Sequence, residues 1–172
     1  MTSLTSTSFL QNASNISTIA TAAFALVALL FAWRQIVVSR RESRLSTART
    51  IYREYLSMAF GHPEMSSASY PLESPSFYTL KKDPAKFEAY EFYVSHLLFA
   101  AETILELSKN QDKWREVLKD QLRYHALYIQ SNAFTRSYYD QDLLTIADEA
   151  IADYLKDAAN NSFKPNPLRG SA

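Results

Sequence analysis

The chain contains no cysteine and only two glycines, Gly61 and Gly170, among its 172 residues. Without cysteine it cannot form disulfides, bind zinc through thiolates or use a thiol nucleophile. The scarcity of glycine argues against phosphate-binding loops, tight hairpins and dinucleotide-binding turns, which depend on that residue. The charge is balanced, with 18 basic and 18 acidic side chains. These limits suit one helical domain with an appendage.

Charged side chains are also missing from the first 33 residues. Within and just beyond that stretch, residues 16–38 would form roughly 34 Å of helix, enough to cross a hydrocarbon core of about 30 Å if Arg34 reaches the interface beside Trp33. The sequence therefore predicts a transmembrane helix over 16–38 after an N-terminal segment over 1–15. A cleaved signal peptide would need a basic start and a small-residue cleavage site, and a buried core helix would rarely run this long without a charge.

Arginine is concentrated on the C-terminal side of the predicted span, at Arg34, Arg40, Arg41, Arg44, Arg49 and Arg53. The N-terminal side has no charged side chain, so the positive-inside rule places the N-terminus outside and the C-terminal domain in the cytoplasm. We expect a single-pass protein of a bacterial inner membrane, with membrane lipid as a partner. The expected interface anchors are Trp33, Arg34, Arg40, Arg41 and Arg44.

Small residues recur along one face of the predicted span, at Ser17, Thr21, Ala25, Ala28 and Ala32. Such a face lets helices approach closely and self-associate in lipid, which makes a homo-oligomer one expectation. The run is rich in alanine, so small residues would also align on a face by chance.

Beyond the span, 3- and 4-residue spacing of apolar side chains predicts four helices, over about 39–60, 84–109, 112–131 and 141–158. The first is either continuous with the span or separated from it by a break near 39–43. Residues 61–83 form a long connection, residues 161–172 a tail, and no strand pattern is evident. The predicted fold is all-α: an N-terminal transmembrane helix that continues or leads into a cytosolic helical bundle of about four helices over 39–160.

Three local signals define the ends of these helices. Gly61 stands where a left-handed C′ residue would end the first helix, and Pro63 follows it. Asp83 and Pro84 predict a side-chain cap followed by proline at the first helical position. In the helix over 84–109 an apolar stripe, which Phe92, Phe99 and Thr103 are expected to widen, predicts the most buried helix.

The sequence offers little catalytic chemistry. His62, His96 and His125 have no histidine or acidic partner at the helical spacing that a metal site needs, so we expect packing or capping roles and no cofactor or metal. Four glutamates of the 84–109 helix are spaced three or four apart in pairs, and a solvated face explains them more simply than acid–base catalysis. They are Glu88, Glu91, Glu102 and Glu106.

Polar and aromatic residues gather near the end of the 112–131 helix, at Tyr124, Tyr128, Arg136, Tyr138 and Tyr139. This cluster suits a surface that binds an unknown protein partner. It equally suits the boundary of a small bundle, where tyrosine buries its ring and keeps its hydroxyl in water. Basic residues elsewhere are interleaved with acids, so nucleic-acid binding is not expected.

The stretches "IYREYLSMAFGHPEMS" and "FEAYEFYVSHLLFAAETILEL" resemble uncharacterised bacterial proteins that have one N-terminal span and a small cytosolic helical domain. The resemblance covers Tyr52 to Glu64 and the helix after Asp83, about a third of the chain, mainly at packing and helix-end positions. It implies no settled activity, although some similar small membrane proteins are thought to act as effectors in phage defence.

Three functions remain open. The first is a non-enzymatic single-pass membrane protein whose cytosolic domain mediates protein interaction or signalling. The second is a self-assembling effector that perturbs the membrane, for example in bacterial phage defence, and the third is a membrane-tethered enzyme using His62 or His125.

Overall fold

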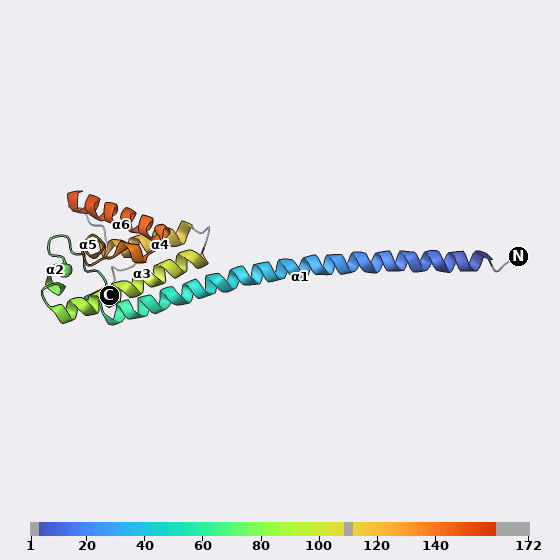
Figure 1. Ribbon diagram of the computed structural model, residues 1–172, viewed down its shortest axis with the longest axis horizontal. Coiled ribbons are helices and arrows are strands. Elements are labelled where there is room, and N and C mark those ends of the chain that lie inside the picture. The colour runs from blue at the N-terminus through green and yellow to red at the C-terminus, as the bar shows by residue number, and fades with distance from the viewer. Residues whose placement is uncertain (1–3, 109–111, 161–172) are drawn as a thin grey trace. The chain divides into compact units, whose positions relative to one another are not determined.

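The structure is a computed structural model that describes residues 4–108 and 112–160, with side chains described for residue 21 and for residues 23–108 and 112–160. Throughout these ranges the chain is helical or in turns, and no strand occurs in them, which confirms the all-α prediction. The chain divides into two units, Met1–Arg44 and Leu45–Ala172. Figure 1 shows the order of the helices along the chain.

Helix α1 (Leu4–Gly61) begins before the predicted span and contains the predicted 39–60 helix without a break near residues 39–43. No proline interrupts it, and the amide of His62 still donates to the carbonyl of Met58 at 3.1 Å. Gly61 is the last helical residue and has no positive φ. The expected left-handed C′ glycine is therefore wrong, because the last turn closes with ordinary helical hydrogen bonds before Pro63.

Helix α3 (Pro84–Leu107) begins as predicted: a side-chain oxygen of Asp83 accepts from the amide of Lys86 at 3.3 Å, and Pro84 occupies the first turn. That hydrogen bond lowers the pKa of the Asp83 carboxyl. Eight of its side chains are buried, more than in any other described helix. Phe92 and Phe99, however, are exposed rather than part of the buried stripe.

The predicted 112–131 helix is divided into α4 (Asp112–Arg123) and α5 (Ala126–Ile129). The break falls at Tyr124 and His125, where backbone carbonyls and amides leave the helical pattern. The long connection over 61–83 supplies the missing partners through a single residue: the amide of Ser69 donates to the carbonyl of Tyr124 at 2.9 Å, and the Ser69 hydroxyl accepts from the amide of Leu127 at 3.0 Å. Ser69 is fully buried, so this connection is part of the packed domain.

The same connection contains the short helix α2 (Ser76–Leu80), whose Phe77 and Leu80 enter the core. After α5, a single 3₁₀ turn η1 (Arg136–Tyr138) leads to the last helix, α6 (Gln141–Asn160). The predicted tail over 161–172 lies outside the described residues.

Helices α4 and α6 run in the same direction. Three ion pairs join them at one constant offset along the chain: Arg115 to Glu149, Lys119 to Asp153 and Arg123 to Asp157. Since the residue numbers rise together on both helices, the two must be parallel. The segment that contains α5 and η1 leads the chain back from the end of α4 to the end at which α4 began (Figure 1).

Tyrosine fills much of the core between these helices. Tyr55 of α1 is fully buried, contacts the ring of Tyr93 at 6.1 Å and donates its hydroxyl to Gln121 of α4 at 3.3 Å. A second group joins Tyr70 of the connection to Tyr124 and Tyr154, at ring distances of 5.4 and 5.5 Å. Tyrosine suits a small bundle because its ring is buried while its hydroxyl still finds a partner.

Candidate functional site

One helix near the N-terminus is long and apolar enough to cross a membrane. Every large apolar side chain from Phe24 to Val38 is exposed, at 46–77% of its surface, and none of the span's apolar window is buried in the protein. Trp33 is among them, at 66%. An apolar surface exposed on all sides of a helix is unfavourable in water and favourable in hydrocarbon.

Of the predicted interface anchors, Trp33 and Arg34 lie near the end of this run, and Arg40, Arg41 and Arg44 follow it. Arg34, Arg40, Arg41 and Arg44 are all exposed, so their guanidinium groups are free of the packed core. On the predicted small-residue face, Thr21, Ala25, Ala28 and Ala32 are exposed as well, while the side chain of Ser17 lies outside the described residues.

The predicted partner surface is divided between the core and the solvent. Tyr124 and Tyr128 are buried, at 3% and 5% exposure, and they belong to different aromatic groups. Tyr139 is half-buried and stacks on the ring of Phe134 at 5.2 Å. Only Arg136 and Tyr138 are exposed, so the five residues do not form one surface.

Arg136 is already engaged within the domain. Its two terminal nitrogens donate to the two carboxylate oxygens of Asp148 at 2.9 and 2.8 Å. This paired geometry raises the pKa of Arg136 and fixes η1 against α6. The contact explains the local structure without a partner protein.

The three histidines lie in three different environments. His62 is exposed and its Nδ1 is 3.5 Å from a carboxylate oxygen of Glu64. His96 is exposed on the outer face of α3. His125 is fully buried, and its Nδ1 shares a hydrogen bond of 2.9 Å with the hydroxyl of Tyr90. They do not converge on one site.

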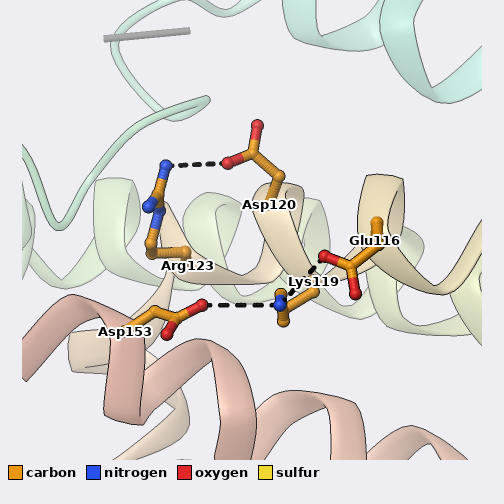
Figure 2. A pocket seen from close by; sticks show the side chains of 5 residues that line it. All are labelled: Glu116, Lys119, Asp120, Arg123 and Asp153. Carbon is orange, nitrogen blue, oxygen red and sulfur yellow. Dashed lines mark hydrogen bonds and ion pairs between the residues drawn. The ribbon is translucent and has the colours of Figure 1, made fainter. Parts of the chain in front are cut away.

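A polar hollow lies between α4 and α6, and it is lined by ion-paired side chains. Figure 2 shows Lys119 between Glu116 and Asp153, at 2.9 and 3.6 Å, beside Arg123 and Asp120. These carboxylates raise the pKa of the Lys119 ammonium, chiefly through its hydrogen bond with Glu116. Each charged side chain of this hollow is paired with an opposite charge, and its three carboxylates outnumber its two cations.

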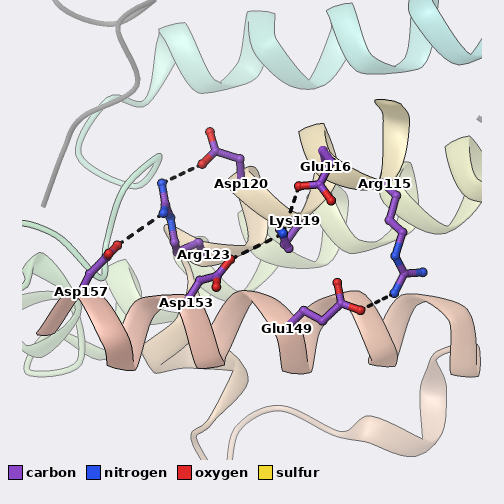
Figure 3. Close-up of polar contacts among 8 residues, drawn as sticks. All are labelled: Arg115, Glu116, Lys119, Asp120, Arg123, Glu149, Asp153 and Asp157. Atoms are coloured by element: carbon purple, nitrogen blue, oxygen red, sulfur yellow. Dashed lines mark hydrogen bonds and ion pairs between the residues drawn. The ribbon is translucent and has the colours of Figure 1, made fainter. Parts of the chain in front are cut away.

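The same charges continue as a ladder along the whole α4–α6 contact (Figure 3). Arg123 lies at its far end, where it donates to Asp120 at 2.7 Å and to Asp157 at 3.3 Å. The hydroxyl of Tyr70 donates to the same oxygen of Asp157 at 3.3 Å. Burial, aided by Asp157 and opposed by Arg123, raises the pKa of the Tyr70 phenol. This ladder fixes two parallel helices and ties the 61–83 connection to them.

A second hollow is acidic, with Glu102 and Glu106 of α3 facing Asp140 and Asp142 at the start of α6. The carboxylate of Glu102 accepts from the amide of Asp140 at 2.7 Å, which satisfies a backbone donor at that helix end. Within the described residues, no group of three or more histidine, cysteine or acidic side chains could hold a metal ion.

The side chains that sequence reasoning misplaced are Phe92 and Phe99, exposed at 70% and 67%. A signal for their position was present in the spacing. Phe92 follows the buried Tyr90 by two residues, which is about 200° around a helix, and Phe99 lies seven residues further on the same face. Phe60, near the end of α1, is also exposed at 85%.

Comparisons with protein-family models, with curated proteins and with solved structures found no match to this chain.

Proposed function

We propose that this chain is a non-enzymatic single-pass membrane protein whose cytoplasmic helical domain mediates protein interaction or signalling at the membrane. The observation that carries the proposal is the run from Phe24 to Val38, whose apolar side chains are exposed and have no packed partner within the described protein. Exposed phenylalanines at Phe92 and Phe99 support an interaction role for the domain, since such side chains on a folded domain are typical of contact surfaces.

The proposed orientation places the N-terminus outside and residues 45–160 in the cytoplasm of a bacterial cell. It rests on the exposed arginines that follow the apolar run, with no opposing charge before it. Because the chain has no cysteine, one introduced cysteine reports its location without background.

The test is labelling of Ser8→Cys and Asn132→Cys with a membrane-impermeant maleimide in intact and in permeabilised cells. Ser8→Cys is expected to react in intact cells, and Asn132→Cys only after permeabilisation. Reaction of Asn132→Cys in intact cells would reverse the topology. Recovery of the unmodified protein in the soluble fraction would refute the proposal that residues 16–38 anchor it in a membrane.

A second candidate is a membrane-perturbing effector, which the exposed small residues Ala25, Ala28 and Ala32 favour. It predicts that overproduction depolarises cells and that Ala28→Leu, which blocks close helix approach, prevents this. Val27→Leu, on another face of the helix, is the matched control. Unchanged membrane potential on overproduction would exclude this candidate.

A further inference from the structure

Three exposed phenylalanines lie on two neighbouring helices of the Leu45–Ala172 unit: Phe60 of α1, and Phe92 and Phe99 of α3. Each exposes at least 67% of its surface. A single exposed apolar side chain needs no explanation, but three large aromatic side chains exposed on one small unit are typical of a contact surface.

On α3 the exposed face is aromatic in the middle and acidic toward the C-terminal end. Phe92, Phe99 and Glu106 follow one another at seven-residue spacing and are exposed. Glu102 lies at the edge of this face; it is half-buried, and one of its carboxylate oxygens accepts from the amide of Asp140. From Phe87 to the end of the helix, the only charged side chains are glutamates, and no lysine or arginine balances them along this face. We call Phe92, Phe99, Glu102 and Glu106 the α3 ridge.

On α1 the matching face is basic and ends in an aromatic ring. Ala48, Tyr55 and Ala59 point into the core, whereas Arg49, Arg53 and Phe60 are exposed on another side of the helix. We call these last three residues the α1 ridge. Neither arginine has a carboxylate within salt-bridge distance in the described domain.

The two ridges match in spacing as well as in charge. Arg49 and Arg53 are four residues apart, as are Glu102 and Glu106. In an antiparallel pair, setting Arg53 opposite Glu102 brings Arg49 opposite Glu106. The same register brings Phe60, seven residues beyond Arg53, opposite Ser95, so its ring enters the space between Phe92 and Phe99.

We propose that the α1 ridge of one copy packs antiparallel against the α3 ridge of a second copy, so that the domain's partner is this chain itself. The inference rests on the proposed function, whose interaction partner it names. Within the Leu45–Ala172 unit α3 runs opposite to the end of α1 (Figure 1), so two copies that lie side by side with these α1 ends parallel place the α3 of one antiparallel to the α1 of the other. The glutamates on the α3 ridge disfavour an anionic membrane surface as the alternative occupant.

The test uses the full chain in nanodiscs or liposomes, with energy transfer between donor- and acceptor-labelled Asn132→Cys copies as the measure of assembly. Arg49→Glu and Glu106→Arg are each expected to weaken assembly roughly fivefold, since each replaces an attraction by a repulsion at an exposed pair. Phe92→Ser is expected to weaken it roughly tenfold through the lost apolar contact. Lys156→Glu, an exposed charge reversal away from both ridges, is the matched control and is expected to change nothing.

Mixing the two single variants is the decisive measurement. Copies carrying Arg49→Glu repel one another, as do copies carrying Glu106→Arg, but in a mixture every contact between unlike copies is again complementary. Assembly of the mixture, and of the double variant R49E/E106R, is expected to return to the level of the unmodified chain.

Assembly that no ridge variant weakens, or that the mixture fails to restore, would overturn the proposal and assign self-association to another surface such as the span. A chain that stays monomeric in the bilayer would also overturn it. The proposed function fails by a different readout, the cysteine labelling and fractionation above, so the two failures are distinguishable.

Discussion

Ser69 joins the 61–83 connection to the interrupted α4–α5 segment, and its hydroxyl is the partner of one backbone amide there. That amide belongs to Leu127 and lies 3.0 Å from the Ser69 hydroxyl oxygen. Ser69 is fully buried, so no water can replace the hydroxyl without opening the contact. Replacing it by alanine keeps the backbone bond from Ser69 to the carbonyl of Tyr124 and removes only the side-chain bond.

We expect Ser69→Ala to lower the free energy of unfolding of the domain by about 1–3 kcal/mol, the cost of leaving a buried donor without an acceptor. For a domain of this size each kcal/mol corresponds to roughly 4 °C in melting temperature. The measurement is thermal and urea unfolding of the full chain in nanodiscs, followed by circular dichroism. Ser137→Ala, an exposed serine in η1, is the control and is expected to change the melting temperature little.

Amide hydrogen exchange provides a second readout with residue resolution. If the hydroxyl protects Leu127, its amide in Ser69→Ala should exchange faster, and by more than amides in the middle of α3. Unchanged exchange at the Leu127 amide, together with a melting temperature equal to that of the control, would refute the conclusion that the Ser69 hydroxyl stabilises the helix break.

Three further predictions concern charges and caps. Arg123→Ala removes the donors to Asp157 at the end of the α4–α6 ladder and should lower the unfolding free energy by about 1 kcal/mol, because the pair is partly exposed. An equal loss in Asp157→Ala and no additional loss in the double variant would show that the two residues are coupled, and additive losses would contradict it. Asp83→Ala should lower the melting temperature at pH 7. Because the folded pKa of this carboxyl is depressed, its contribution to stability is present above about pH 4 and is lost as the pH falls through the folded pKa. A difference in melting temperature between the variant and the wild type that persists at pH 2 would contradict the capping role. Burial raises the pKa of Tyr128 to about 12, so the stability that its neutral phenol contributes is present below about pH 10 and is lost between about pH 10 and 12. Ultraviolet titration of the wild type against Tyr128→Phe would detect this raised pKa. Ionisation of this phenol near pH 10 in the folded protein would refute the prediction.

Local signals in the sequence were sufficient for the helix type and for several helix ends. The cap by Asp83 and the start at Pro84 depend on residues three apart, so they are readable without tertiary structure. The start of α6 at Gln141 and its buried residues Leu143, Ala147 and Ala150 follow from spacing alone. Burial of α3 follows from the apolar stripe that includes Tyr90, Val94 and Ile104, whereas the wider stripe expected from Phe92 and Phe99 is wrong because both are exposed.

Other features depended on partners that lie far apart in the chain. The break at Tyr124 and His125 falls inside a stretch whose periodicity continues as one helix, and it is compensated by Ser69, more than 50 residues earlier. Tyr124 and Tyr128 are buried and do not belong to an exposed partner surface, because the residue type alone does not reveal whether a tyrosine ring faces the core. Phe92 and Phe99 are exposed because they lie on the side of α3 opposite the buried Tyr90, although their apolar character favours burial.

The sequence by itself determined that the chain is helical, that its N-terminal run suits a bilayer, and that arginines follow that run on one side, since each of these depends only on composition and spacing along one helix. Only the tertiary structure decided that α4 and α6 are parallel, that the long connection closes the helix break, and which aromatic rings are exposed. These depend on contacts between residues distant in sequence, such as Arg123 with Asp157, and no local propensity encodes which distant side chain will be met.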